Sequence, residues 1–168
     1  MTMESFSVST IMNVDVKKIT ADQNITGACK IMHDNQIGSV VIVELEDPKL
    51  KPVGIITERD IVRILGELKP WLSRLPLREL MSKPVIRIES KASLKDAADT
   101  MNSHNVRRLI VVDAANNMVG IISEKDIFRE MAKNRELVAE FFGDRLHAEG
   151  KKLFEKVADF NLGYPRKL

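Results

Sequence analysis

The sequence has one cysteine, few aromatic side chains and no long apolar run. Cys29 has no second cysteine with which to form an internal disulfide, and we expect it to be a plain core residue on the apolar face of a helix. The apolar run Val40 to Val43 is far too short to cross a bilayer, and the N-terminus lacks the basic start and apolar stretch of a signal peptide. We therefore expect a cytoplasmic protein that does not associate with membranes.

The chain also lacks a strong net charge and the common catalytic motifs. Its formal charge of +2, with 44% apolar and 30% charged residues, is ordinary for a soluble protein and does not favour nucleic-acid binding. No phosphate-binding glycine loop, dinucleotide fingerprint, C-x-x-C, H-E-x-x-H or G-x-S-x-G motif occurs. His33, His104 and His147 lie far apart, and helix ends explain the first two more simply than a metal site does. We expect a non-catalytic protein without a bound metal.

An internal repeat organises most of the 168 residues. The segment 11–43 matches 80–112 at a constant offset of 69, and the offset falls to 66 after a connection that is three residues longer in the first copy. The best match pairs the octet VGIITERD, residues 53–60, with VGIISEKD, residues 119–126. The chain therefore contains two copies of one structural unit.

Each copy predicts the order β-α-β-β-α. The first extended segments are 16–19 and 85–88, and the central strands are 39–45 and 109–113. The first helix of each copy has apolar residues at i, i+3, i+4 and i+7, with Asn24 and Ser93 as its N-caps. One copy of about 60 residues can bury only a modest core, so we expect the two copies to pack sheet against sheet with pseudo-twofold symmetry.

These elements predict a mixed α/β (α+β) fold with four parts. Residues 1–69 form the first repeat, 70–76 an apolar and packed linker, 77–133 the second repeat, and 134–168 a helical C-terminal extension. The extension has mixed charges and a phenylalanine-rich stripe, which favour a protein contact over a nucleic-acid surface.

Each octet ends with a hydroxyl residue and, three residues later, an aspartate: Thr57 with Asp60, and Ser123 with Asp126. One interpretation is a capping box that satisfies the unpaired N–H groups of the following helix. The other is a ligand site, in which the helix N-terminus favours a phosphate and the carboxylate accepts both hydroxyls of a ribose. The repetition of the pattern in register favours the site without excluding the cap.

The combined pattern resembles the CBS domain, the module named after cystathionine β-synthase and normally found in pairs. The resemblance covers roughly residues 8 to 133 and rests on a V-x-x-V segment, an A-x-x-x-M helix, a V-V-x-D strand and G-h-h-(T/S)-x-x-D. It implies a Bateman module, in which two clefts bind adenosyl compounds and pairs of modules form dimers.

Site residues follow from this resemblance by position. Asp60 and Asp126 would hold ribose hydroxyls, and the backbone of Lys17 and Ile86 would read the adenine edge. The first cleft comprises Val16, Lys17, Ile37, Gly38, Ser39, Ile56, Thr57, Arg59 and Asp60. The second comprises Val85, Ile86, Val106, Arg107, Arg108, Ile122, Ser123, Lys125 and Asp126.

The two clefts are not equivalent, because Gly38-Ser39 in the first copy corresponds to Arg107-Arg108 in the second. Paired arginines suit phosphate recognition, so we expect tighter phosphate binding in the second cleft, with Lys125 assisting. The alternative is that these arginines are solvated surface charges.

We therefore expect a regulatory module that senses AMP, ADP, ATP or S-adenosylmethionine, with or without magnesium, and needs no cofactor. It would act as a homodimer and signal to a protein partner through changed packing of the two copies. One alternative is a structural interaction protein with vestigial clefts, whose C-terminal helix mediates oligomerisation or docking. A weak nucleotide-processing enzyme is a second alternative, for which no general base is visible.

Overall fold

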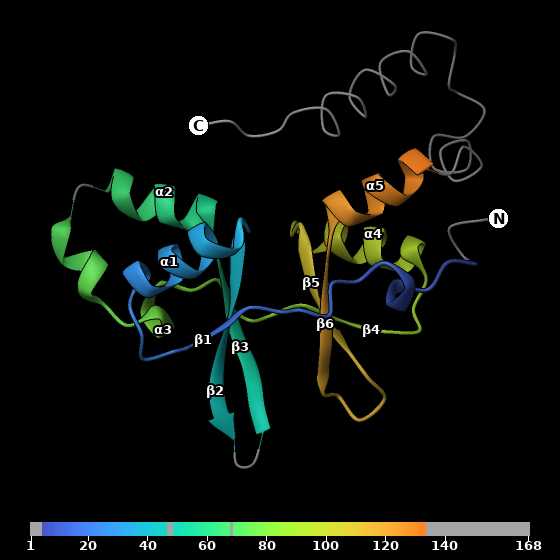
Figure 1. The fold of residues 1–168 in the computed structure, drawn as a ribbon, viewed down its shortest axis with the longest axis horizontal. Coiled ribbons are helices and arrows are strands. Elements are labelled where there is room, and N and C mark those ends of the chain that lie inside the picture. The colour runs from blue at the N-terminus through green and yellow to red at the C-terminus, as the bar shows by residue number, and fades with distance from the viewer. Residues whose placement is uncertain (1–4, 47–48, 68, 134–168) are drawn as a thin grey trace, which may run out of the picture. The chain divides into compact units, whose positions relative to one another are not determined.

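The computed structural model describes residues 5–46, 49–67 and 69–133 (Figure 1). The expected mixed α+β class is confirmed, with two three-stranded sheets and helices. The described residues form two compact units, a larger one from residues 13–89 and 109–121 and a smaller one from 5–12, 90–108 and 122–133. The helical extension expected over 134–168, which includes His147, lies outside the described residues.

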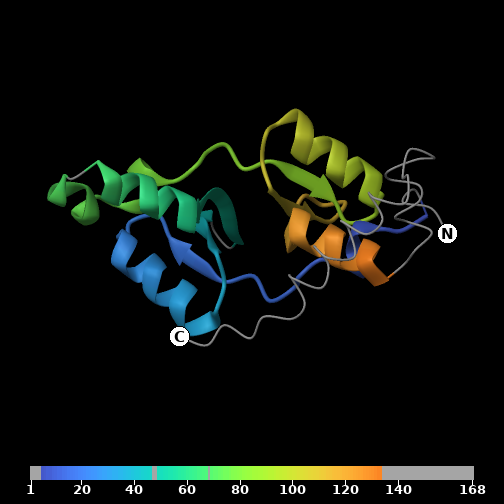
Figure 2. The same cartoon turned by 90° about the horizontal axis from the view of Figure 1, so that it is seen from above.

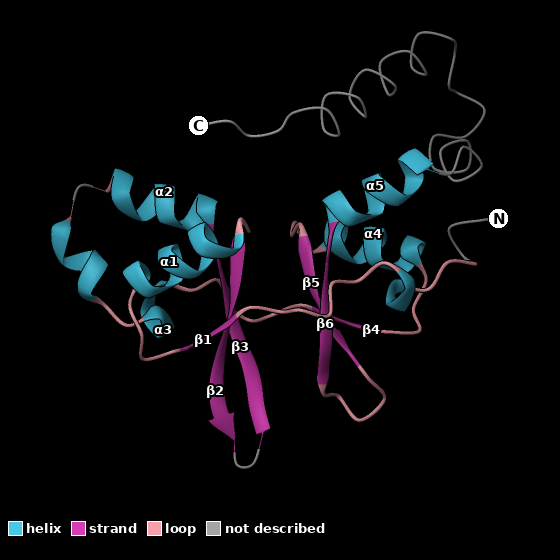
Figure 3. Ribbon diagram, in the orientation of Figure 1, coloured by secondary structure: helices cyan, strands magenta, loops and turns pink. Residues whose placement is uncertain are grey.

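The first sheet of the larger unit has the order β1-β2-β3. Strand β1 (Lys18–Thr20) runs parallel to β2 (Ser39–Glu46), and β3 (Lys49–Thr57) runs antiparallel to β2 with a register shift between Ile42 and Val43. Helices α1 (Ile25–Asn35) and α2 (Glu58–Gly66) lie on one side of this sheet (Figure 3). They bury one core with it, which includes Ile25, Ala28, Met32, Val40, Ile42, Ile56 and Ile64.

Helix α1 has the caps that its sequence predicts. The Asn24 side chain accepts a hydrogen bond from the Gly27 N–H at 3.2 Å, as expected of the N-cap. The helix ends at Gln36 in the left-handed conformation, with φ 53°, and the Ile37 N–H then donates to the Met32 carbonyl. Cys29 is partly buried against the core of this sheet.

The segment after α2 packs against the same core. It consists of a 3-10 helix, η2 (Pro70–Arg74), and the short helix α3 (Leu77–Leu80). In the linker, Leu72 is buried in the core and Leu75 packs against it, as a packed linker requires, whereas Trp71 is 56% exposed. The linker is therefore held by its leucines and not by its aromatic residue.

The second sheet has the order β4-β5-β6. Strand β4 (Arg87–Glu89) is parallel to β5 (Arg108–Val112), and β6 (Met118–Ser123) is the other neighbour of β5. Apart from the ends of β5 and β6, this sheet also belongs to the larger unit. The two sheets share a core of Val41, Val43, Ile110 and Val112, so the larger unit combines strands of both repeats.

The repeats also exchange the segments that lead into their first strands, which we name the leading segments, residues 12–16 and 81–85. Asn13 forms two backbone hydrogen bonds with Ile121 of β6, at 2.8 and 2.9 Å. Ser82 forms the corresponding pair with Ile55 of β3, at 3.1 and 2.9 Å. The leading segment of each repeat is therefore bonded to the last strand of the other.

The smaller unit contains a 3-10 helix, η1 (Val8–Thr10), and helices α4 (Leu94–Ser103) and α5 (Glu124–Lys133). Helices α4 and α5 lie side by side (Figure 2). The Val8 N–H donates to the Ala92 carbonyl at 2.8 Å, which fixes η1 beside the start of α4. No helix in the described part of the chain has both the length and the apolar composition needed to cross a bilayer.

Candidate functional site

The first octet forms a complete capping box at the start of α2. The Thr57 N–H and hydroxyl donate to Asp60 Oδ2 at 2.9 and 2.7 Å, and the Asp60 N–H donates to Thr57 Oγ1 at 3.4 Å. These bonds satisfy N–H groups that would otherwise be unpaired at the helix start. The capping interpretation is therefore confirmed for this octet, and it uses one of the two carboxylate oxygens.

The other oxygen of Asp60 accepts a hydrogen bond that the sequence did not suggest. The Ser82 hydroxyl donates to Asp60 Oδ1 at 3.2 Å, and the Arg63 guanidinium lies 3.7 Å from the same atom. The Asp60 side chain is 13% exposed, so it is close to fully enclosed but reachable from solvent. A residue of the second leading segment thus contacts the carboxylate of the first octet.

Met81 brings this leading segment against the glycine of the octet. A methyl group built on Gly54 would overlap Met81 Sδ and lie 2.9 Å from Met81 Cβ. Because no real side-chain carbon approaches so closely, glycine is the residue that fits under Met81. Local sequence gives no signal for the Ser82 contact, since it depends on two segments that are more than 20 residues apart.

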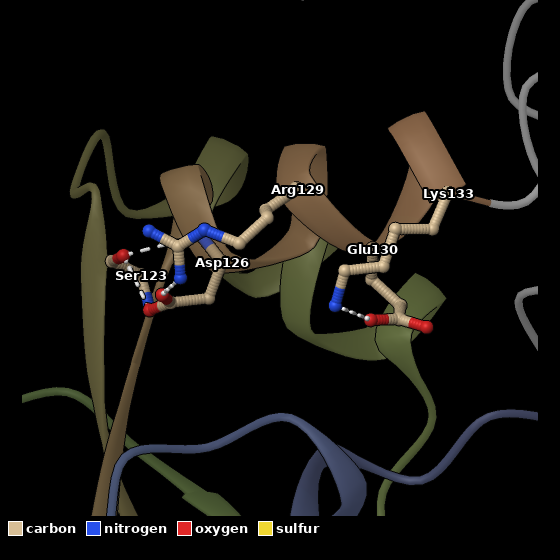
Figure 4. Close-up of polar contacts among 5 residues, drawn as sticks. All are labelled: Ser123, Asp126, Arg129, Glu130 and Lys133. Atoms are coloured by element: carbon tan, nitrogen blue, oxygen red, sulfur yellow. Dashed lines mark hydrogen bonds and ion pairs between the residues drawn. The ribbon is translucent and has the colours of Figure 1, made fainter. Parts of the chain in front are cut away.

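The second octet forms the same box at the start of α5. The Ser123 N–H and hydroxyl donate to Asp126 Oδ2 at 2.9 and 2.6 Å, and the Asp126 N–H donates to Ser123 Oγ at 3.4 Å. Arg129 reaches back along the helix and donates to Asp126 Oδ1 at 3.1 Å (Figure 4). The Asp126 side chain is 22% exposed. An arginine of the following helix lies beside the Oδ1 atom in both octets, and the hydrogen bond from Ser82 is found at Asp60.

A third capping box, at the start of α4, provides an internal comparison. The Ser93 N–H and hydroxyl donate to Asp96 Oδ2 at 3.0 and 2.7 Å, as in the octets. Hydrogen bonds from Ser93 hold the pKa of Asp96 below its ordinary value. Asp96 is exposed and a turn separates its helix from β4, whereas Asp60 and Asp126 are half-buried in helices that directly follow β3 and β6. The box alone does not mark a ligand site, but its placement at a strand end distinguishes the octets.

Several predicted residues of the first cleft lie together at one end of the first sheet. Ser39 pairs with Thr57 across β2 and β3, and the Glu58 N–H donates to the Gly38 carbonyl at 3.2 Å. The Lys17 carbonyl accepts from the Val41 N–H at 3.1 Å, which places the start of β1 beside β2. The sheet pairing therefore brings the backbone of Gly38 and Ser39 to the start of α2, and places Lys17 beside β2 at Val41.

Other predicted residues have different surroundings. Ile56 is 0% exposed within the helix–sheet core, and Ile122 is also 0% exposed, so neither presents a surface to a base in this structure. Successive strand residues face opposite sides, which turns these isoleucines toward the interior. The remaining positions are half-buried Val16 and Ile37, exposed Arg59, and Lys17, whose ammonium group lies 2.8 Å from Asp15.

The smaller unit contains a pocket of about 560 Å³ between α4 and α5. Two residues predicted for the second cleft, Val106 and Arg107, line it together with Glu124 and Phe128, which the sequence did not single out. Ser123 and Asp126 are not among its lining residues. The pocket therefore covers only part of the predicted second site.

The remaining residues of the second cleft are spread over both units. Val85 and Ile86 belong to the larger unit, where Val85 packs against the sheet–sheet core and the Ile86 carbonyl accepts from the Ile110 N–H at 3.0 Å. In the smaller unit Arg108 is half-buried and Lys125 is exposed. Within the described ranges, no group of three or more histidine, cysteine or acidic side chains is placed to hold a metal ion.

Comparison with known proteins identifies the repeated unit. The model of the CBS domain family matches residues 8–67 and again residues 77–133. The chain belongs to the CBS-domain family. Each match contains one complete octet, so the two CBS domains carry the two capping boxes described above.

One curated relative is the uncharacterized protein MK0525 of Methanopyrus kandleri, which is 34% identical over 127 residues. The alignment covers 76% of this chain and 63% of that protein, so the chain spans less than two thirds of the relative's length.

Solved structures share the arrangement of a CBS pair. The CBS domain pair of protein MJ0100, in complex with 5′-methylthioadenosine and S-adenosyl-L-methionine, has a TM-score of 0.66 and 28% identity, covering 76% of this chain and 97% of that one. The CBS domain protein PAE2072 from Pyrobaculum aerophilum, complexed with AMP, has a TM-score of 0.65 and 25% identity, covering 76% and 99%. The fold of this chain is therefore that of a CBS domain pair.

Proposed function

We propose that this CBS pair is a regulatory, non-catalytic module that binds an adenosyl ligand at the start of α2 and at the start of α5. The observation that carries the proposal is the position of Asp60 and Asp126, two half-buried carboxylates that each follow a strand and keep one oxygen outside the capping box. The ligands of MJ0100 and PAE2072, which share this fold, support an adenosyl compound.

In the first cleft, Asp60 would accept the ribose hydroxyls, and Thr57 would lie beside the ribose or phosphate. The backbone of Lys17 would read the adenine edge, next to Val16 and Ile37. Gly38, Ser39 and Arg59 complete the proposed cleft, and a contact with Ile56 requires that its side chain move out of the core.

In the second cleft, Asp126 and Ser123 take the same roles, and Ile86 supplies the backbone for adenine. Arg107, Arg108 and Lys125 would hold the phosphate, because guanidinium groups donate two parallel hydrogen bonds to an oxyanion. Val85, Val106 and Ile122 would contact the base.

The ligands that fit this chemistry are AMP, ADP, ATP and S-adenosylmethionine, with magnesium accompanying the polyphosphates. We further propose a cytoplasmic homodimer that passes the bound state to a protein partner, without nucleic acid or membrane. Residues 1–69 and 77–133 would be the two repeats, 70–76 their linker and 134–168 an extension for partner contact.

The test is isothermal titration of the full chain with AMP, ATP and S-adenosylmethionine, together with three matched variants. Asp60→Asn and Asp126→Asn should each remove one binding event, whereas Asp96→Asn, in the third capping box, should leave binding unchanged. A ligand present at 100 times its dissociation constant should also add about 2.7 kcal/mol of stability. Equal losses in all three variants would show that the carboxylates act only through helix stability, and the proposal would be wrong.

The alternative, a structural interaction protein with vestigial clefts, is favoured by two observations. The capping boxes already use the hydroxyls of Thr57 and Ser123, and Ile56 and Ile122 are fully buried. If none of the three ligands binds at millimolar concentration, this alternative replaces the sensor.

A further inference from the structure

The carboxylate of Asp60 has few acceptor positions left for a ligand. An ionised carboxylate offers about four lone-pair sites on its two oxygens. The N–H and the hydroxyl of Thr57 occupy two of them at Oδ2, at 2.9 and 2.7 Å. The Ser82 hydroxyl occupies a third at Oδ1, at 3.2 Å. About one site remains.

A ribose diol that donates both of its hydroxyls needs two acceptor sites on this carboxylate. One of the three existing bonds must therefore open when such a ligand binds. The two bonds from Thr57 are shorter and belong to the cap of α2, so losing either would also destabilise the helix. The bond from Ser82 is the longest of the three and is exposed, which makes it the one that gives way.

We propose that Ser82, a residue of the second leading segment, is a specificity-determining residue of the first cleft. A ribose displaces its hydroxyl from Asp60, whereas a 2′-deoxyribose, which has one hydroxyl fewer, uses the remaining acceptor site and leaves Ser82 in place. The inference rests on the proposed binding of an adenosyl ligand at Asp60 and adds a residue that belongs to the other repeat.

The displacement is transmitted to the second leading segment, since Ser82 is part of its backbone. The N–H and the carbonyl of Ser82 both form hydrogen bonds with the backbone of Ile55, and the preceding residue, Met81, lies against Gly54. Beyond Ser82 the chain continues into β4. Loss of the hydroxyl contact therefore loosens one of the attachments of this segment to β3.

The second octet has a different arrangement. At the position equivalent to Ser82 stands Asn13, whose side-chain oxygen accepts from the Asp15 N–H at 2.9 Å. Asp126 Oδ1 accepts from Arg129 at 3.1 Å, within the same helix. The link between a ribose carboxylate and a leading segment is thus a feature of the first cleft, which makes Asn13→Ala a matched control.

The experiment measures the first cleft alone, in full-length protein carrying Asp126→Asn. AMP and 2′-deoxy-AMP are titrated calorimetrically into this background with and without Ser82→Ala. Removing the competing hydroxyl should tighten AMP binding about threefold to tenfold, the range expected for one net hydrogen bond, and leave 2′-deoxy-AMP unchanged. The ratio of the two affinities therefore rises in Ser82→Ala and stays constant in Asn13→Ala.

A second readout does not depend on the Asp126→Asn background. In the wild-type chain AMP should increase hydrogen–deuterium exchange over residues 81–89, and in Ser82→Ala this exchange should already be raised without ligand. If AMP does not bind, or if Asp60→Asn removes none of the AMP binding, the proposed function of the cleft itself is wrong. Binding at Asp60 with an unchanged affinity ratio in Ser82→Ala, or with weaker AMP binding, would overturn the role of Ser82 alone.

Discussion

Replacing Gly54 by alanine tests the contact between the two repeats directly. The added methyl group would overlap Met81 Sδ and lie 2.7 and 2.9 Å from Met81 Cγ and Cβ. The sulfur can move away by side-chain rotation, but the position of Cβ is set by the backbone. This backbone is held on both sides: the Met81 N–H donates to the Leu77 carbonyl at 2.8 Å, and the next residue, Ser82, forms two backbone hydrogen bonds with Ile55. The methyl group therefore cannot be accommodated by side-chain rotation alone.

The magnitude follows from two opposing effects. Overpacking of this kind typically costs about 1–3 kcal/mol, whereas a glycine to alanine change at a permissive backbone gains about 0.4–1 kcal/mol through the unfolded state. We expect a net loss of about 1–2 kcal/mol in the free energy of unfolding, or roughly 2–8 °C in Tm for a chain of this size. The loss is expected because three atoms of Met81 lie below the closest normal approach.

Urea denaturation of the full chain gives the measurement, with Gly66→Ala as the control. A methyl group on Gly66, the last residue of α2, meets nothing within 4 Å, so this variant should be neutral or slightly more stable. The double variant Gly54→Ala/Met81→Ala should be less destabilised than the sum of its single changes, because the clash is gone. Strict additivity, or a Gly54→Ala variant as stable as wild type, would refute the reasoning.

Three further outcomes are expected. Ser93→Ala should lower the free energy of unfolding by about 1 kcal/mol and leave the AMP affinity unchanged. Ser123→Ala should lower both the free energy of unfolding and the AMP affinity. Denaturation and calorimetry on the same samples measure the two quantities separately. Because Ser93 holds the pKa of Asp96 low, the stability from this carboxylate is present above about pH 4 and is lost as the pH falls through its folded pKa. Asp96→Asn should therefore flatten the acid side of the stability–pH curve, and an unchanged curve would contradict the cap. Burial raises the pKa of the Cys29 thiol, so iodoacetamide should modify it more slowly in the native chain than in urea at about pH 8, and equal rates would contradict its packing.

Local patterns were sufficient to predict the elements and their caps. The apolar spacing of α1 and α4 placed both helices, and Asn24 and Ser93 act as their N-caps. The first strands were predicted two residues too early, over 16–19 and 85–88, whereas β1 begins at Lys18 and β4 at Arg87. The reason is that the side chains of Val16 and Val85 pack against the sheet–sheet core, whereas their backbones lie outside the paired strands.

Long-range pairing is the part that the sequence could not provide. Nothing near Ser82 indicates that its hydroxyl meets Asp60, and nothing near Asn13 indicates its bonds to Ile121. The sequence also left the octets open between a cap and a site. The structure forms the cap in both, yet the second carboxylate oxygen of each remains outside it, so the two interpretations are compatible.

The exchange of leading segments makes the two halves of the chain interdependent. A fragment ending near residue 69 would lack Ser82, whose backbone pairs with Ile55. A fragment beginning near residue 77 would lack Asn13, whose backbone pairs with Ile121. Each excised half would then expose an unpaired strand edge, which promotes self-association. Such a module is therefore expected to be cloned, grafted or fused to other domains successfully only as an undivided pair.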